Sequence, residues 1–187
     1  MDWDQLKSTC EKCSRCPLHA NRHHVVFGIG QETADIMFVG EGPGEQEDLQ
    51  GEPFVGAAGK FLDEMLSILD ISRDKNCYIA NIVKCRPPHN RDPEEHEQDV
   101  CIEYLMEQIK LVKPKVIVCL GRIAAKRLID PDFRITRQHG LWSEKDGIWY
   151  GAIYHPSALL RDPSKRPETF DDLMSLRKLL RKLHIHI

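Results

Sequence analysis

The sequence of 187 residues predicts an α/β fold in which strands alternate with helices. Three observations support this prediction. Four short apolar runs are typical of buried strands, helical patterns lie between them, and the hydrophobic and charged fractions of 41% and 29% suit a folded globular protein. Residues 1–187 are most economically one domain, because ordinary domains contain about 100–200 residues. No repeat, low-complexity tract or linker favours a second domain.

We predict four strands, each an apolar run that ends in a polar segment marked by glycine or proline. They are ADIMFVGEGPG at 34–44, NCYIANIVK at 76–84, PKVIVCLG at 114–121 and IWYGAIYHP at 148–156. Strands that alternate with helices form a parallel sheet with helices on both faces. Ligands gather at the carboxyl ends of such strands, so we expect GEGPGEQED, NIVKCRPPHNR, LGR and HPSALLR to meet at one edge.

Helical patterns fill the gaps between the strands. Apolar residues recur at helical spacing in GAAGKFLDEMLSILDIS and in PEEHEQDVCIEYLMEQIKLVK. The closing helix has an acidic start and a basic end, which is the arrangement that the helix dipole favours. The predicted helices lie within 56–72, 93–113, about 122–129 and 169–183.

The chain carries no targeting or membrane signal. The first residues contain no apolar stretch of signal-peptide length, and no run of about 18 apolar residues occurs anywhere. We therefore expect a cytoplasmic protein with no membrane partner. No obligate protein partner is evident, and we expect a monomer. The net charge of −3 does not exclude nucleic-acid binding, because a groove can be positive on a mildly acidic protein.

Seven cysteines in a reducing compartment favour free thiols or metal thiolates over disulfides. The candidate ligands are CxxC at 10–13, CxxC at 13–16 and the distant pair Cys85 and Cys101. Four thiolates from two segments suit either zinc or an iron-sulfur cluster, and spacing does not decide between them. Cys77 and Cys119 lie in apolar strands, where free cysteines usually belong to the core.

Polar residues at the strand ends have both structural and functional interpretations. Glycines in GEGPGEQED would let the backbone approach a ligand, but the acidic residues of that loop would repel phosphate, and a solvated turn is equally compatible. Phe54 is either a core plug beneath its loop or a surface that stacks on a planar ring. Asn81 braces the interior or reads a carbonyl next to an N–H, which is the pattern on the edge of uracil. His155 closes a strand or donates a hydrogen bond to developing negative charge.

The order of these segments resembles the iron-sulfur uracil-DNA glycosylases, family 4 of that superfamily. CSRCPL is followed by GEGPGEQED, GEPFVGAAGKFLDEML, YIANIVKCRPPHNR and HPSALLR, so the resemblance runs from about Cys13 to Arg161. It implies a single α/β/α domain with a central four-stranded parallel sheet, in agreement with the four runs above. It also implies a DNA repair enzyme that flips uracil out of DNA and hydrolyses its N-glycosidic bond, releasing uracil and leaving an abasic site.

The resemblance gives the strand-end residues roles. Glu41 and Gly42 belong to the catalytic loop, where Gly42 leaves space and an amide near the base. Phe54 becomes the stacking platform, Asn81 the reader of the uracil edge, and His155 the donor to the leaving uracil anion. We expect the C5 methyl of thymine to be excluded by Phe54 or its loop.

On the DNA side, the resemblance places Leu159 where the superfamily inserts an apolar side chain into the gap left by a flipped nucleotide, with Leu160 a weaker candidate. A brace between Glu47 and Asn90 is a further hypothesis. The cations expected on the DNA backbone are Arg86, Arg91, Arg161 and Lys165.

For the cofactor, the resemblance implies one 4Fe-4S cluster. The family pattern selects Cys13 and Cys16 from the local run and completes the set with Cys85 and Cys101. Cys10 is then the spare sulfur, one that could replace a lost ligand.

Two other functions compete with this prediction. A non-catalytic iron-sulfur or zinc protein that binds nucleic acid would keep the four cysteines without needing Glu41, Asn81 and His155 together, and this chain has all three. A superfamily enzyme of altered base specificity would carry a different first motif or a long basic insertion between Cys85 and Cys101. Here the first motif is GEGPG, and the insertion does not occur.

Overall fold

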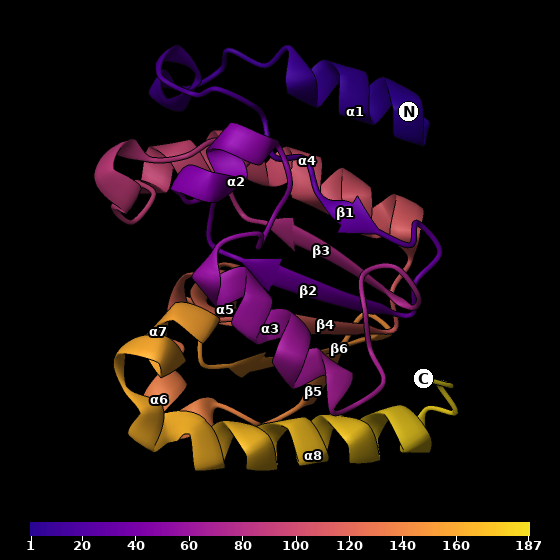
Figure 1. Cartoon of the computed structure of the whole chain (residues 1–187). Helices are drawn as coiled ribbons and strands as arrows, with labels where there is room; N and C mark the ends of the chain where they lie inside the picture. The colour runs from indigo at the N-terminus through magenta and orange to yellow at the C-terminus, as the bar shows by residue number, and fades with distance from the viewer.

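The computed structural model describes all residues, 1–187, and consists of one sheet between two layers of helices (Figure 1). The sheet has six strands in the order β1-β3-β2-β4-β6-β5. Its four inner strands run parallel to one another and are the four predicted from sequence. They are β2 (Ile36–Gly40), β3 (Cys77–Asn81), β4 (Val116–Leu120) and β6 (Ile148–Ile153).

The expected four-stranded sheet is extended by an antiparallel strand at each edge, which the sequence did not predict. The edge strand β1 (Ile29–Gly30) has only two residues and pairs with β3. The other, β5 (Ser143–Lys145), consists of exposed polar residues and pairs with β6. Asp146 and Gly147 join β5 to β6 with φ of 53° and 82°, and an Asp-Gly pair in this conformation is a known signal of a two-residue hairpin turn.

The helices divide between the two faces of the sheet. The four predicted helices form, and four further helices accompany them. In chain order the helices are α1 (Trp3–Glu11), α2 (Glu45–Gln50), α3 (Ala57–Ser67), α4 (Glu95–Val112), α5 (Arg122–Leu128), α6 (Ile135–Gln138), α7 (Pro156–Arg161) and α8 (Arg166–Lys182). Three short 3-10 turns lie at Pro17–Ala20, Pro88–Asn90 and Pro163–Lys165. No helix combines the length and the apolar composition that crossing a bilayer requires.

The core lies on both sides of the inner strands, because successive strand side chains point to opposite faces. On β2, Ile36 and Phe38 pack against helices α3, α7 and α8, whereas Met37 and Val39 pack against α4 and α5. Burial on both faces explains why the inner strands appear in the sequence as continuous apolar runs. Helix α1 adds an outer layer over α4 through a small cluster that contains Leu6 and Tyr104 (Figure 1).

Candidate active site

The carboxyl ends of β2, β3, β4 and β6 open into a cavity of about 700 Å³. The structure therefore brings together segments that are far apart in the sequence, as the parallel topology predicted. The predicted site residues that line the cavity are Glu41, Gly42, Phe54, Asn81, Arg91, His155, Arg161 and Lys165. Arg86 and Leu159 do not line it.

Asn81 is the last residue of β3 and lies beside Gly40 of β2 in the strand register. Its side chain is buried, and its Oδ1 atom has no hydrogen-bond partner. A Cβ atom on Gly40 would lie 2.5 Å from that oxygen and 2.6 Å from the Phe54 ring, so only glycine fits there. An unpaired buried acceptor costs about 1–3 kcal/mol. The amide is therefore prepared to receive an N–H group from a bound molecule.

Phe54 is both a core residue and a residue that lines the cavity. Its side chain is buried as part of the larger core cluster, and its ring also lines the cavity. The ring centroid lies 5.6 Å from that of His155, with the planes inclined by 31°. Its backbone has a φ of 53°, in the left-handed region that bulky residues rarely occupy. Such a conformation persists only where the surrounding structure holds it.

His155 ends the segment after β6 and caps helix α7. Its Nδ1 atom accepts a hydrogen bond from the Ser157 backbone N–H at 3.1 Å, and the Ser157 hydroxyl lies 2.7 Å away. Burial, together with a smaller effect of the positive charge of Arg161, lowers the pKa of His155 to about 4. The imidazole is thus neutral near pH 7, and since Nδ1 accepts, the proton resides on Nε2. The site contains a neutral hydrogen-bond donor.

Glu41 follows β2, and its backbone carbonyl accepts a hydrogen bond from Val83 N–H at 3.1 Å. No side-chain hydrogen bond restrains its carboxyl group, which faces the cavity. Burial raises the pKa of Glu41, and repulsion by Asp92 raises it further, while Arg122 and Arg161 lower it. A carboxylate that is partly desolvated and unpaired is available to stabilise positive charge or to orient water.

Cations gather at the rim of this cavity, and the sequence predicted only some of them. Arg161 and Lys165 line it, as expected, and Arg122 of the LGR segment was missed. Arg122 pairs with Asp92 at 2.5 Å, and both side chains are about half exposed. The position of LGR at a strand end was the signal that could have identified Arg122.

In the structure, Arg91 and Arg86 are hydrogen-bonded to neighbouring side chains. Arg91 donates to both carboxylate oxygens of the buried Glu97, at 2.7 and 3.0 Å, and so braces the start of α4. Arg86 donates to Asn90 Oδ1 at 2.7 Å. A guanidinium already paired with a buried carboxylate is less available to a phosphate, because separation would leave that carboxylate unpaired.

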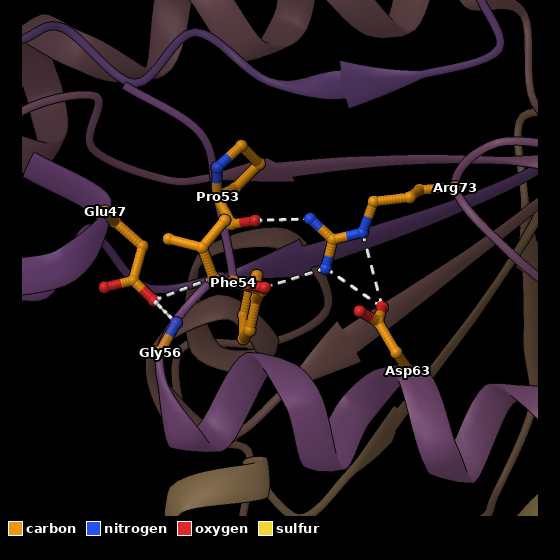
Figure 2. Close-up of polar contacts among 7 residues, drawn as sticks. Glu47, Pro53, Phe54, Gly56, Asp63 and Arg73 are labelled. Atoms are coloured by element: carbon orange, nitrogen blue, oxygen red, sulfur yellow. Dashed lines mark hydrogen bonds and ion pairs between the residues drawn. The ribbon is translucent and has the colours of Figure 1, made fainter. Parts of the chain in front are cut away.

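The expected brace between Glu47 and Asn90 does not form. The carboxylate of Glu47 accepts from the backbone N–H groups of Val55 and Gly56, each at 3.2 Å (Figure 2). Because Glu47 lies in the first turn of α2, its side chain reaches the neighbouring GEPFVG loop, while Asn90 is bound by Arg86.

The choice of Leu159 as the inserted side chain is corrected by its burial. Leu159 is fully buried in the core cluster shared by α3, α7 and α8, whereas Leu160 is 39% exposed. Successive helix residues point about 100° apart, so the two neighbours face the core and the solvent respectively. Leu160 is the apolar side chain that α7 presents outward.

Five cysteines converge on a second, much smaller cavity of about 20 Å³. They come from α1 and the loop after it, from the segment after β3, and from α4, and they are Cys10, Cys13, Cys16, Cys85 and Cys101. All seven cysteines are free thiols, and Cys77 and Cys119 are core residues as predicted. No group of three His, Cys, Asp or Glu side chains is spaced to hold a single metal ion.

Lys84 lies between the two cavities and was missed from the sequence. Its side chain is fully buried and lines the cysteine cavity. The ammonium donates to the backbone carbonyl of Asn81 at 3.0 Å and to Gln108 Oε1 at 2.6 Å, and it forms no ion pair with a carboxylate. Its backbone N–H donates to Cys101 Sγ at 3.3 Å. One residue thus contacts both the backbone of the cavity-lining amide and the group of sulfurs.

The lowered pKa of His155 predicts a pH-dependent contribution to stability. Between its folded value of about 4 and the ordinary 6.5, the unfolded chain binds a proton on this imidazole that the folded chain does not bind. Stability is therefore lost as the pH falls through this range. His155→Gln should show a shallower loss, measured by urea unfolding at about pH 7 and about pH 5. The exposed His186→Gln is the control, and equal slopes for wild type and His155→Gln would contradict the prediction.

Comparison with known proteins identifies relatives across almost the whole chain. The sequence model of the Uracil DNA glycosylase superfamily matches residues 27–179. A Type-4 uracil-DNA glycosylase of Archaeoglobus fulgidus is 44% identical over 189 aligned positions, which cover 96% of this chain and 94% of the relative. One from Thermotoga maritima is 42% identical, covering 92% and 91% of the two chains.

A member of a neighbouring type is more distant. A Type-5 uracil-DNA glycosylase of Pyrobaculum aerophilum is 28% identical, over 84% of this chain and 83% of the relative. A Type-4 uracil-DNA glycosylase of the same organism is 42% identical, over 92% of each chain. The cavity at the carboxyl ends of the parallel strands and these near-complete alignments point to the same group: the chain belongs to the Uracil DNA glycosylase superfamily and, within it, to the type-4 uracil-DNA glycosylases.

Proposed function

We propose that this protein binds uracil flipped out of DNA and hydrolyses its N-glycosidic bond, releasing uracil and leaving an abasic site. The single observation that carries the proposal is the unpaired, buried Oδ1 of Asn81, which lies beside Gly40 of β2, as the Phe54 ring does. A buried acceptor without a partner marks the place where a ligand N–H belongs.

The edge of uracil matches a side-chain amide. Uracil presents its N3–H donor beside the O4 acceptor, and an amide offers an acceptor beside a donor. Cytosine presents an exocyclic amine where uracil has O4, so an amide held in this orientation rejects it, and a mispaired buried group costs about 1–3 kcal/mol. The position of Asn81 at a strand end supports this role, since the absence of a side chain on its neighbour Gly40 leaves room for both the amide and the Phe54 ring.

Breaking the glycosidic bond leaves a negative base and a positive sugar, so donors are needed at the base and negative charge near the sugar. His155 is neutral and carries its proton on Nε2, which suits a donor to the uracil anion. The Gly42 amide lies in the same cavity. Glu41 supplies the negative charge, through electrostatics or by orienting the attacking water. Its raised pKa implies that cleavage slows at low pH, as the carboxylate becomes protonated.

The DNA backbone is proposed to lie along the cations at the cavity rim, Arg161, Lys165 and Arg122. Sequence-independent phosphate contacts of this kind provide affinity and position the duplex. Arg86 and Arg91 are proposed to support that surface through their bonds to Asn90 and Glu97. Leu160 is proposed as the side chain that fills the gap left by the flipped nucleotide.

The cysteine cavity is proposed to hold one 4Fe-4S cluster on Cys13, Cys16, Cys85 and Cys101, distant from the chemistry and structural in role. Thiolates from separate segments are the ligands such clusters take. The buried Lys84 ammonium has no carboxylate partner, so the negative charge of cluster thiolates would neutralise it. Arg22, which donates to Cys85 Sγ at 3.5 Å, fits the same charge. A bound cluster would supply cross-links between the loop after α1, helix α4 and the segment after β3.

Action as a monomer in the cytoplasm remains part of the proposal. One chain provides every group that the reaction needs, which supports a monomer. The decisive experiment is incubation of the purified protein with uracil-containing DNA, scoring abasic sites together with bound iron and zinc. Abasic sites that accumulate only at uracil would support the proposal. Iron without cleavage would support the alternative, a non-catalytic nucleic-acid-binding module.

Replacing Glu41 with Gln removes the negative charge and keeps the shape of the side chain. We expect cleavage to slow by about 10²–10⁴-fold while binding of uracil-containing DNA survives. Single-turnover cleavage and filter binding measure the two quantities. The exposed Glu52→Gln, which lies outside the cavity, is the control. Near-normal turnover of Glu41→Gln would exclude Glu41 from the chemistry.

Leu159 and Leu160 form a matched pair of substitutions. Leu160→Ala should slow cleavage of uracil in duplex DNA more than in single strands, because only the duplex leaves a gap to fill. Leu159→Ala should instead lower the free energy of unfolding by about 2–5 kcal/mol, because it opens a cavity in the core. Duplex and single-strand rates with urea unfolding separate the two effects, and the reverse pattern would restore Leu159 as the inserted residue.

The ligand set predicts which cysteines retain iron. Cys13→Ser or Cys16→Ser should lose or weaken the cluster, whereas Cys10→Ser should keep it. Iron per chain and visible absorbance are the measurements. Cys10 is buried against Leu6, Phe27 and Tyr104, so unfolding curves control for loss of packing. Iron loss in Cys10→Ser at normal stability would make Cys10 a ligand.

A further inference from the structure

The left-handed backbone of Phe54 is held by hydrogen bonds to the loop backbone on both of its sides. On one side of the loop the carboxylate of Glu47 accepts from two backbone N–H groups. On the other side the guanidinium of Arg73 donates to the carbonyl of Pro53 at 2.6 Å and to that of Phe54 at 2.8 Å (Figure 2). The conformation of this residue is therefore specified through its backbone, by partners on both sides.

Arg73 is itself well anchored. Its Nη2 and Nε atoms donate to Asp63 Oδ1 at 3.0 and 3.3 Å, and its side chain is only 11% exposed. Asp63 belongs to α3, whose Gly59 packs against the same loop. A Cβ on Gly59 would lie 1.9 Å from the Phe54 carbonyl oxygen. The loop is thus pressed against the helix and held there by a side chain with three polar partners.

The guanidinium is suited to this task in a way that an ammonium is not. Its donors form a rigid planar fork, so one group can hold two consecutive carbonyls and a carboxylate at once. Arg73 lies in the turn before β3 and does not line the cavity. It can affect a bound base only through the position of Phe54.

The Phe54 ring lines the cavity against Gly40 and His155, so its position sets where a pyrimidine stacks on it. We propose that Arg73 is a positioning residue for base selectivity: by holding the carbonyls of Pro53 and Phe54 it fixes the plane in which the base stacks, so that a methyl-sized group at C5 collides with the cavity wall. The inference rests on the proposed uracil excision and adds to it a determinant of which pyrimidines are rejected.

When Arg73 is removed, the strained residue is free to relax to a negative φ, which moves the ring away from His155 and enlarges the cavity. Selectivity should then fall, because one methyl-sized group in an apolar site is discriminated by only about 10–200-fold. Uracil cleavage itself should fall less, since Asn81, His155 and Glu41 keep their own supports in the strands and in α7.

The test compares Arg73→Met, Arg73→Lys and the control Arg127→Met on DNA containing uracil, 5-bromouracil or thymine. Arg127 has an ion pair of its own with Asp99 at 2.6 Å and lies outside the cavity. For Arg73→Met we expect the ratio of kcat/KM for uracil over 5-bromouracil to fall by about tenfold or more. The ratio measured for Arg73→Lys should lie between those of wild type and Arg73→Met. The ratio measured for Arg127→Met should equal that of wild type.

Several outcomes would overturn the inference. An unchanged ratio in Arg73→Met, or an equal loss in Arg127→Met, would show that Arg73 acts on stability alone. If Arg73→Met does not fold, Arg73→Lys carries the test, because it keeps a positive charge opposite Asp63 and loses the fork.

A double substitution checks the route of the effect. In a Phe54→Ala background, Arg73→Lys should leave the ratio unchanged, because the ring it positions is gone. A further fall in that background would contradict the inference. A wild-type protein that releases no uracil would instead overturn the proposed function, so the two failures are distinguishable.

Discussion

The parallel pairing of β2 with β3 is the constraint on which the rest of the site depends. Its register places Gly40 beside Asn81 at the ends of both strands. Because Gly40 lacks a side chain, the amide and the Phe54 ring can both occupy the space above it. Glu41 follows directly, and its carbonyl is fixed by the strand extension at Val83. A shift of one residue would turn Asn81 to the opposite face of the sheet and dismantle the cavity.

The pKa values of two polar groups of the cavity are shifted in opposite directions. Burial lowers the pKa of His155 and raises that of Glu41. In the first case burial yields a neutral donor, and in the second a carboxylate with little hydration and no hydrogen-bond partner. Both shifts arise from desolvation, which disfavours whichever form is charged. A site proposed to separate negative charge on a base from positive charge on a sugar uses one group of each kind.

Lys84 gives the two cavities a physical connection. A fully buried ammonium hydrogen-bonded only to neutral oxygens is costly unless negative charge lies near it. Lys84 also lines the cavity of the five cysteines. In the proposed holoprotein, charge on the thiolates would stabilise the ammonium, and the ammonium would hold the carbonyl of Asn81. A structural cluster would in this way contribute to the rigidity of the base-reading strand end.

The sequence by itself determined the parallel strands, the longer helices and the core role of Cys77 and Cys119, because these follow from local periodicity. It also determined that Glu41, Asn81 and His155 converge, because the carboxyl ends of parallel strands share one edge of the sheet. The sequence did not predict the two edge strands, because β1 has only two residues and β5 is polar. Only the tertiary structure decided that Leu160 and not Leu159 faces outward, that Arg91 is bound to Glu97, and that Arg73 holds Phe54 from 19 residues away. These features depend on contacts between elements, and such contacts leave no periodic trace in the chain.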